Sequence, residues 1–319
     1  MYFPVSGVEV NPLVPPLVAF VVSSVTSSAG ISGAFLLLPF QVSVLGFVSP
    51  SVSPTNLIYN IIAVPGGLYR YIKEGRMAWR LAWVFVLGTL PGVFAGAWIR
   101  IKYLPDPKNF KLFIGLVLLY LGIRLVYQIA GCSGRGTDGM EKKFRDTVSS
   151  VKEGTGAKIA AGLPPDVTIK TKRFSLGRVE YEFWGETYSF RTIIVFSLAL
   201  IVGLIGGIYG IGGGAIIAPL CVSFLRLPVY IIAGAVLAVN FFTSVAGVFF
   251  FSFLASTAVG MQASVAPDWV LGALFGAGGF LGTYVGARTQ RFLPEKLIRI
   301  VLGVLVILIA VHYIIQYYL

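Results

Sequence analysis

The chain has 319 residues, a net charge of +12 and a mean hydropathy of +0.85, with 56% hydrophobic and only 12% charged residues. A soluble core of this size cannot bury so much apolar surface, so the composition excludes a soluble globular protein and predicts an integral membrane protein. Basic residues lie between the apolar runs, as in loops at a membrane surface, which argues against nucleic-acid binding. We expect a multi-pass protein of the plasma membrane, surrounded by membrane lipids.

Eight apolar segments follow one another along the chain. They are continuous and rich in Leu, Ile, Val and Phe, unlike the alternating strands of a β-barrel. The first and the fifth are too long for one span, because a helix of about 34 residues would measure about 50 Å against a hydrocarbon core of about 30 Å. We therefore expect both to be broken. The segments are 13–48, 53–69, 80–100, 112–130, 192–225, 229–255, 269–290 and 300–318.

A glycine cluster marks the expected break in each overlong segment. The first cluster leads from Gly30 to Pro39, and the second leads from Gly210 to Pro219. Consecutive glycines let several backbone N–H groups converge, and a following helix adds the positive end of its dipole. Such a break can hold an anion without a fixed cation, and in transporters it is where a binding site is expected. The alternative is that these glycines only let two helices cross closely.

The two clusters belong to a longer internal repeat. At an offset of 180, Asn60 also matches Asn240, and at an offset of 190, Trp79 matches Trp269. We therefore predict an all-α integral membrane fold of two homologous four-segment repeats with broken first helices, residues 1–130 and 192–319. The loop 70–80 is basic and its counterpart 256–268 is not, which favours an inverted repeat. Small residues spaced by four are expected to pack helices closely: Gly88, Gly92, Gly96, Gly278, Gly282 and Gly286.

Residues 131–191 differ from both halves, because they are rich in charge and contain no apolar run long enough to span a membrane. We expect a small soluble insert here. Alternation in 167–170 and 179–184 predicts a β-hairpin. A hairpin alone is only marginally stable, so it is expected to rest on the membrane body or on a second subunit, which leaves a homo-oligomer open.

Polar residues inside the apolar segments are candidates for a substrate site. An amide at lipid depth needs partners, and Asn240, Thr243 and Ser244 share one helical face. The alternative is that Asn60 and Asn240 only join neighbouring helices. Lesser candidates are Ser27, Ser28, Gln41 and Tyr59. The predicted substrate-binding residues are Gly30, Ser32, Gly33, Asn60, Gly210, Gly212, Gly213, Gly214, Asn240, Thr243 and Ser244.

The chemistry of these residues favours an anion. The broken segments and the helices that follow them contain no Asp, Glu, Lys or Arg, so they offer no carboxylate relay and no site for a multivalent cation. Neutral donors and helix dipoles suit a small oxyanion. With one His and two Cys, the chain offers no catalytic set and no metal site, so we expect neither an enzyme nor a cofactor.

The chain resembles the TauE/SafE sulfite exporter family, also called the toluene sulfonate uptake permease family. The resemblance rests on G-I-G-G-G-x-x-x-x-P at 210–219, its weaker copy at 30–39, Asp268-Trp269, and the turns Leu104-Pro105 and Leu293-Pro294. It implies a secondary transporter that exports sulfite or an organosulfonate by alternating access around the paired breaks. Ser32 and Ala34 replace two glycines of the motif, so the second half is expected to contribute more. The alternative is a non-transporting membrane sensor or scaffold whose insert binds a partner.

Overall fold

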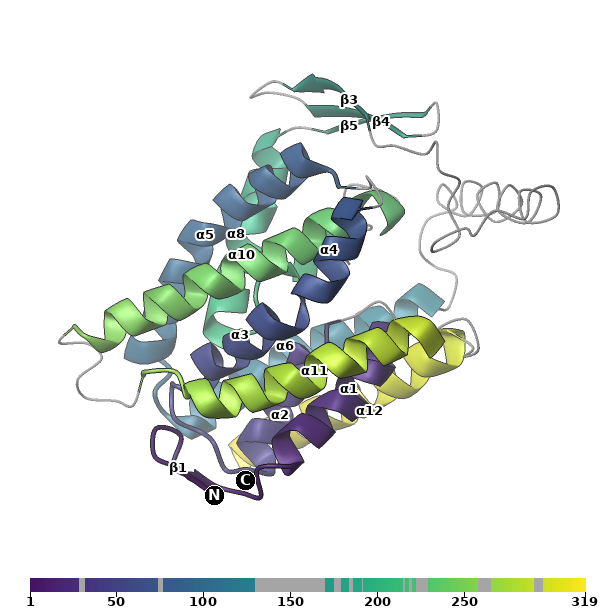
Figure 1. The fold of residues 1–319 in the computed structure, drawn as a ribbon. Coiled ribbons are helices and arrows are strands. Elements are labelled where there is room, and N and C mark those ends of the chain that lie inside the picture. Colours follow the sequence, from purple (N-terminus) through teal and green to yellow (C-terminus); the bar gives the residue numbers. More distant parts are fainter. Residues whose placement is uncertain are drawn as a thin grey trace.

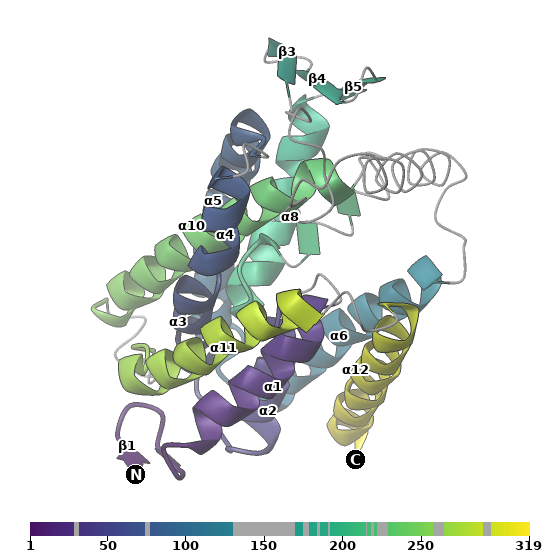
Figure 2. The same cartoon turned by 45° about the vertical axis from the view of Figure 1, so that its right-hand side comes forward.

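The computed structural model describes residues 1–28, 32–73, 77–129, 170–174, 179–183, 186–190, 192–214, 216–217, 220–221, 229–257, 265–289 and 295–319. The described protein is mostly helical (Figures 1 and 2). The first half contains α1 (Val14–Ser28), α2 (Ala34–Ser43), α3 (Val52–Ala63), α4 (Pro65–Lys73), α5 (Trp79–Lys102) and α6 (Pro107–Ile129). The second half contains α8 (Thr192–Tyr209), α10 (Val229–Ala255), α11 (Trp269–Thr289) and α12 (Glu295–Tyr318).

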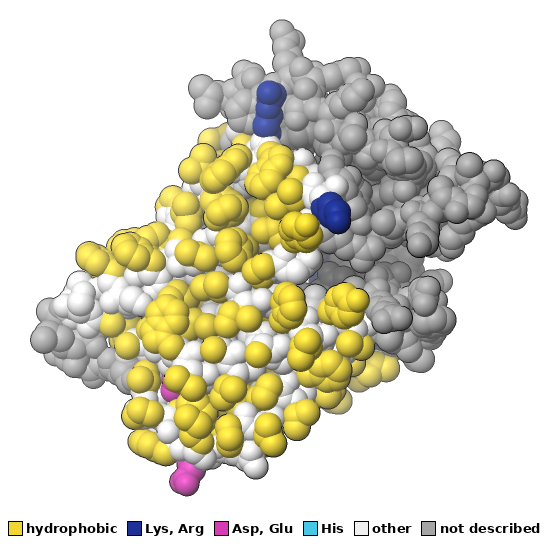
Figure 3. All heavy atoms as spheres, in the orientation of Figure 1, with side chains coloured by type: hydrophobic (Ala, Val, Ile, Leu, Met, Phe, Trp, Pro, Cys, Tyr) yellow, Lys and Arg dark blue, Asp and Glu magenta, His cyan; other side chains and the backbone are white. Residues whose placement is uncertain are grey.

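Six helices among the described residues are long and apolar enough to cross a membrane. They comprise Trp79–Lys102, Pro107–Tyr127, Thr192–Tyr209, Gly234–Ala255, Trp269–Gly286 and Ile300–Tyr318. Hydrophobic side chains are spread over the described part of the face shown in Figure 3, with Lys and Arg toward its upper part and acidic residues toward its lower part. A surface of this kind is stable only against lipid, and the multi-pass membrane protein expected from the sequence is confirmed.

Both overlong segments are interrupted where the glycines lie. In the first, α1 ends at Ser28 and α2 begins at Ala34. In the second, α8 ends at Tyr209. The second apolar segment is also divided, which was not predicted: α3 ends at Ala63 and α4 begins at Pro65. Proline lacks an N–H group, so the helical hydrogen bond from residue 65 to the carbonyl four residues earlier cannot form, and the division falls at Val64.

The helices pair across the two halves. α1 packs on α11, α5 on α8 and α6 on α12, while α3 lies against both α10 and α11. Exchanging the halves would map the first two pairs onto each other. This pairing is consistent with a pseudo-symmetric repeat, but the repeat and its inversion remain predictions.

The predicted glycine stripes lie at these interfaces. A Cβ on Gly92 or Gly96 of α5 would collide with the backbone of α8, and one on Gly278 or Gly282 of α11 with the backbone of α1. The expectation that small residues allow close helix packing is confirmed.

A three-stranded antiparallel sheet is described between the two halves, in the order β3 (Lys170–Phe174), β4 (Val179–Phe183), β5 (Glu186–Phe190). The predicted strand over 179–184 corresponds to β4, whereas β3 begins only at Lys170 and β5 was not predicted. Most of the remaining segment 131–191 lies outside the described residues, and its role as a soluble insert remains a prediction. The sheet lies at one end of the helices in Figures 1 and 2, and the N-terminal hairpin of β1 (Tyr2–Phe3) and β2 (Val8–Glu9) lies at the other.

Candidate functional site

The second break is a sharp turn that only glycine fits. Gly210 and Gly212 have φ angles of +82° and +72°, in the region that costs other residues about 1–2 kcal/mol. A Cβ on Gly210 would collide with the backbone of Ser53, and one on Gly212 with the side chain of Asn240. The helical hydrogen-bond pattern resumes with Ile217 donating to the Gly213 carbonyl at 3.2 Å. The turn is thus pressed between α3 and α10.

One face of α3 satisfies the carbonyl groups that the break leaves open. Three polar side chains spaced by three and four residues donate to three carbonyls at the end of α8 and in the turn. The bonds are Ser53 Oγ to Ile208 O at 3.0 Å, Asn56 Nδ2 to Gly210 O at 2.9 Å, and Asn60 Nδ2 to Ile211 O at 2.9 Å. Asn56 also donates to the carbonyl of Ala34 at 3.0 Å, so it contacts both broken segments.

Asn60 connects the two halves of the predicted site. Its Oδ1 accepts hydrogen bonds from Ser32 Oγ at 3.3 Å and from Asn240 Nδ2 at 3.4 Å. The two asparagines that match in the sequence are therefore neighbours in space, and Ser32 of the first break joins them. Both asparagines are buried and Ser32 is partly buried, and a buried amide without a partner would be unfavourable.

The α10 residues have two different roles. Thr243 Oγ1 accepts the N–H of Gly213 at 3.1 Å and donates to the Val239 carbonyl at 2.6 Å, so it holds the turn in place. Asn240 Oδ1 and Ser244 Oγ are buried and have no hydrogen-bond partner among the described residues. Both lie beside Gly212. The site thus contains two unused polar atoms next to the turn.

Hydroxyl groups surround Gly33 of the first break. A Cβ on Gly33 would lie 2.6 Å from the Tyr59 hydroxyl, 3.1 Å from Ser23 Oγ and 3.3 Å from Thr26 Oγ1. Ser23 and Tyr59 are hydrogen-bonded to each other at 2.8 Å. Gly30, also predicted to bind substrate, lies outside the described residues. The two breaks therefore present different polar groups, in line with the differences between the two glycine motifs.

Ser53, Asn56 and Tyr209 were not predicted from the sequence, and neither were Ser23 and Thr26 beside Gly33. Ser53 and Asn56 could have been found, because they share a helical face with Asn60. The Tyr209 hydroxyl donates to the Phe35 carbonyl at 2.9 Å. Pro39, four residues after Phe35, has no N–H group to offer that carbonyl, so Tyr209 replaces the missing helical bond. No local pattern predicts that partnership.

Charged side chains are buried elsewhere in the described protein. The Arg100 guanidinium lies 3.5 Å from the centre of the Phe110 ring and donates to the carbonyls of Val48 and Leu104. Asp268 caps α11 by accepting the N–H of Leu271 at 3.0 Å. Neither contacts the glycine turn in any of these interactions, and the hydrogen bonds that the structure describes at the turn come from neutral groups.

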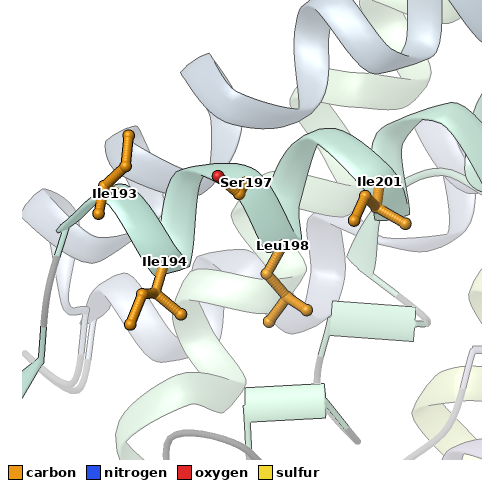
Figure 4. Close-up of a pocket in the computed structure, with 5 residues that line it drawn as sticks. All are labelled: Ile193, Ile194, Ser197, Leu198 and Ile201. Atoms are coloured by element: carbon orange, nitrogen blue, oxygen red, sulfur yellow. The ribbon is translucent and has the colours of Figure 1, made fainter.

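The pocket in Figure 4 is not part of this site. It lies on α8 and is lined by Ile193, Ile194, Ser197, Leu198 and Ile201. Its three isoleucines are 49–65% exposed, so the hollow opens on the apolar outer surface, where lipid is expected.

Comparison with known proteins connects these features to a family. A family model described as "Sulfite exporter TauE/SafE" matches residues 16–313. The chain is similar to the "Probable membrane transporter protein YunE" of Bacillus subtilis (strain 168), at 20% identity over 301 residues that cover 92% of this chain and 93% of the relative. It is also similar to a "Probable membrane transporter protein" of Xylella fastidiosa (strain Temecula1 / ATCC 700964), at 23% identity over 89% of this chain and 87% of the relative. No solved structure matches.

Proposed function

The chain belongs to the sulfite exporter TauE/SafE family of membrane transporters, and from that premise we propose that it exports a small sulfur-containing oxyanion, sulfite or an organosulfonate. The printed names of its relatives describe membrane transporters and not enzymes. The proposal adds a substrate class, a direction and a site to this coarser assignment.

One observation carries the proposal: a glycine turn is buried among neutral polar groups from both halves. Hydroxyls and amides can hold an oxyanion through hydrogen bonds, and the absence of a fixed charge in these contacts lets it leave again. Export of an anion from a cell that is negative inside is favourable by about 2.3 kcal/mol per charge per 100 mV. Transport in this direction therefore does not require coupling to protons.

The hydrogen bonds of α3 support a mechanism of alternating access. In the described state the amides of Asn56 and Asn60 donate hydrogen bonds to carbonyl groups of the second break, and Asn56 also donates to a carbonyl of α2. We propose that separation of α3 from one broken segment opens the site, with water or the anion replacing these partners. Return of the amides closes it.

Purified protein in liposomes tests the proposal directly. Vesicles loaded with radiolabelled sulfite or a radiolabelled organosulfonate should show saturable efflux of at least one of them, and protein-free vesicles loaded in the same way should not. A folded protein that moves neither sulfite nor any organosulfonate would overturn the proposal and favour the sensor or scaffold alternative.

A further inference from the structure

The hydrogen bonds around Asn60 determine how the amide of Asn240 is oriented. The Ile211 carbonyl can only accept, so Asn60 must turn its NH2 group toward it. Asn60 Oδ1 then faces Asn240, which must turn its own NH2 group toward that oxygen. Asn240 Oδ1 consequently points the other way. The unused atom of this amide is an acceptor and not a donor.

This acceptor lies in a buried place beside Ser244 and the glycine turn. Asn240 is 3% exposed and Ser244 is 0% exposed, and neither Asn240 Oδ1 nor Ser244 Oγ has a partner among the described residues. A Cβ on Gly212 would lie 3.0 Å from Ser244 Oγ and would collide with Asn240 Oδ1. Buried polar atoms normally have hydrogen-bond partners, so two adjacent exceptions beside the glycine turn indicate where a ligand supplies those partners.

We propose that Asn240 Oδ1 and Ser244 Oγ accept a hydrogen bond donated by an O–H group of the transported ion. The substrate is then a singly protonated oxyanion such as hydrogensulfite. This inference rests on the proposed function and narrows its substrate class. A sulfonate group or the sulfite dianion has only acceptor oxygens, which the amide oxygen of Asn240 would repel. A protonated oxyanion offers its O–H to Asn240, and its other oxygens can accept from hydroxyl groups such as those around Gly33.

Any pH dependence of transport between about pH 5.5 and 8.5 would then arise from the substrate. The helices packed against α10 are α3, α4 and α5, and α8 leads into the turn. None of these five helices contains Asp, Glu or His. Their other titratable side chains are Tyr, Lys and Arg, and none of these residue types ordinarily titrates within this pH range. These are Tyr59, Tyr69, Arg70, Tyr71, Lys73, Arg80, Arg100, Lys102, Tyr209 and Tyr230. Cys221 follows the turn in the sequence, and a Cys221→Ala variant controls for its thiol.

The test compares two anions in proteoliposomes at several pH values. At constant total sulfite, efflux should fall in proportion to the hydrogensulfite fraction as the pH rises. Methanesulfonate, which has one charge and no O–H group, should move at least about tenfold more slowly than hydrogensulfite. Sulfite flux that follows the dianion, or equal rates for methanesulfonate, would overturn the inference and leave the proposed function standing. Absence of flux for every anion would overturn both.

Variants assign the effect to this acceptor. Asn240→Leu keeps the size of the side chain and removes its oxygen, so the preference for hydrogensulfite over methanesulfonate should drop at least about fivefold. Ser244→Ala removes a hydroxyl that bonds to no described residue, so it should fold normally and lower the same ratio. Asn109→Leu on α6, outside the site, is the control and should leave the ratio unchanged. An unchanged ratio in folded Asn240→Leu or Ser244→Ala protein would contradict the inference.

Discussion

Gly212 is constrained both by its backbone and by the candidate site. Its φ angle is +72°, and the Asn240 amide lies against it. Gly212→Ala should cost about 1–2 kcal/mol in backbone energy and displace Asn240, so we expect anion flux to be lost. Gly46→Ala is the matched control, because Gly46 has a φ of +66° and nothing within 4 Å of its Cβ position. Flux in proteoliposomes and thermal unfolding in detergent check both variants. Equal flux in the two would contradict a role for this turn.

Tyr209 stabilises the contact between the two broken segments by donating to the Phe35 carbonyl. Tyr209→Phe leaves that carbonyl buried and unpaired, so the free energy of unfolding should fall by about 1–3 kcal/mol. Tyr103→Phe is the control, because Tyr103 is 58% exposed. Denaturation in detergent micelles measures the difference. The interpretation fails if both tyrosine variants are equally stable.

At the scale of elements, the contact between α5 and α8 depends on residues without side chains. A Cβ on Gly92 would collide with the Leu200 carbonyl, whereas one on Gly67 of α4 would make an ordinary contact at 3.4 Å. Gly92→Ala should therefore destabilise the protein by about 1–3 kcal/mol through overpacking, and Gly67→Ala should not. Melting temperatures in one detergent compare them. A Gly92→Ala protein as stable as the parent would show that α5 and α8 can separate without loss.

The N-terminus of α11 depends on a buried cap. Asp268 accepts the N–H of Leu271 and also the hydroxyl of Ser6 at 2.8 Å, which holds the N-terminal hairpin. Asp268→Ala should lower the free energy of unfolding by about 1–3 kcal/mol. Asp106→Ala removes an exposed cap, whose Oδ1 accepts the N–H of Lys108 at 3.0 Å, and should cost about 1 kcal/mol or less. Chemical denaturation of the two variants tests the order, and a larger loss in Asp106→Ala would refute it.

At the scale of the whole molecule, the three-stranded sheet and the N-terminal hairpin lie at opposite ends of the helices (Figures 1 and 2). They should therefore face opposite sides of the membrane. In a Cys132→Ser, Cys221→Ala background, Thr187→Cys in β5 and Tyr2→Cys in β1 should react with a membrane-impermeant maleimide from opposite sides. Intact cells and inverted vesicles provide the two sides. Labelling of both from one side would contradict this topology.

Much of the architecture could be predicted from the sequence because it depends on local properties. Hydropathy determined the membrane class, and glycine clusters in overlong segments located both breaks. The matched spacing of Asn60 and Asn240 placed two polar residues that prove to be neighbours. Pro65 could have predicted the division between α3 and α4. It lies within a continuous apolar run, which was interpreted as one segment.

What only the tertiary structure decided is which groups satisfy one another. Ser53 and Asn56 bond to carbonyls more than 150 residues away, and Tyr209 bonds to a carbonyl that Pro39 leaves open. The orientation of the Asn240 amide follows from a chain of such contacts. Hydropathy and helical spacing depend on near neighbours along the chain and can be read there. Hydrogen-bond partners depend on how the two halves pack, so the donor or acceptor character of the site emerges only from the folded protein.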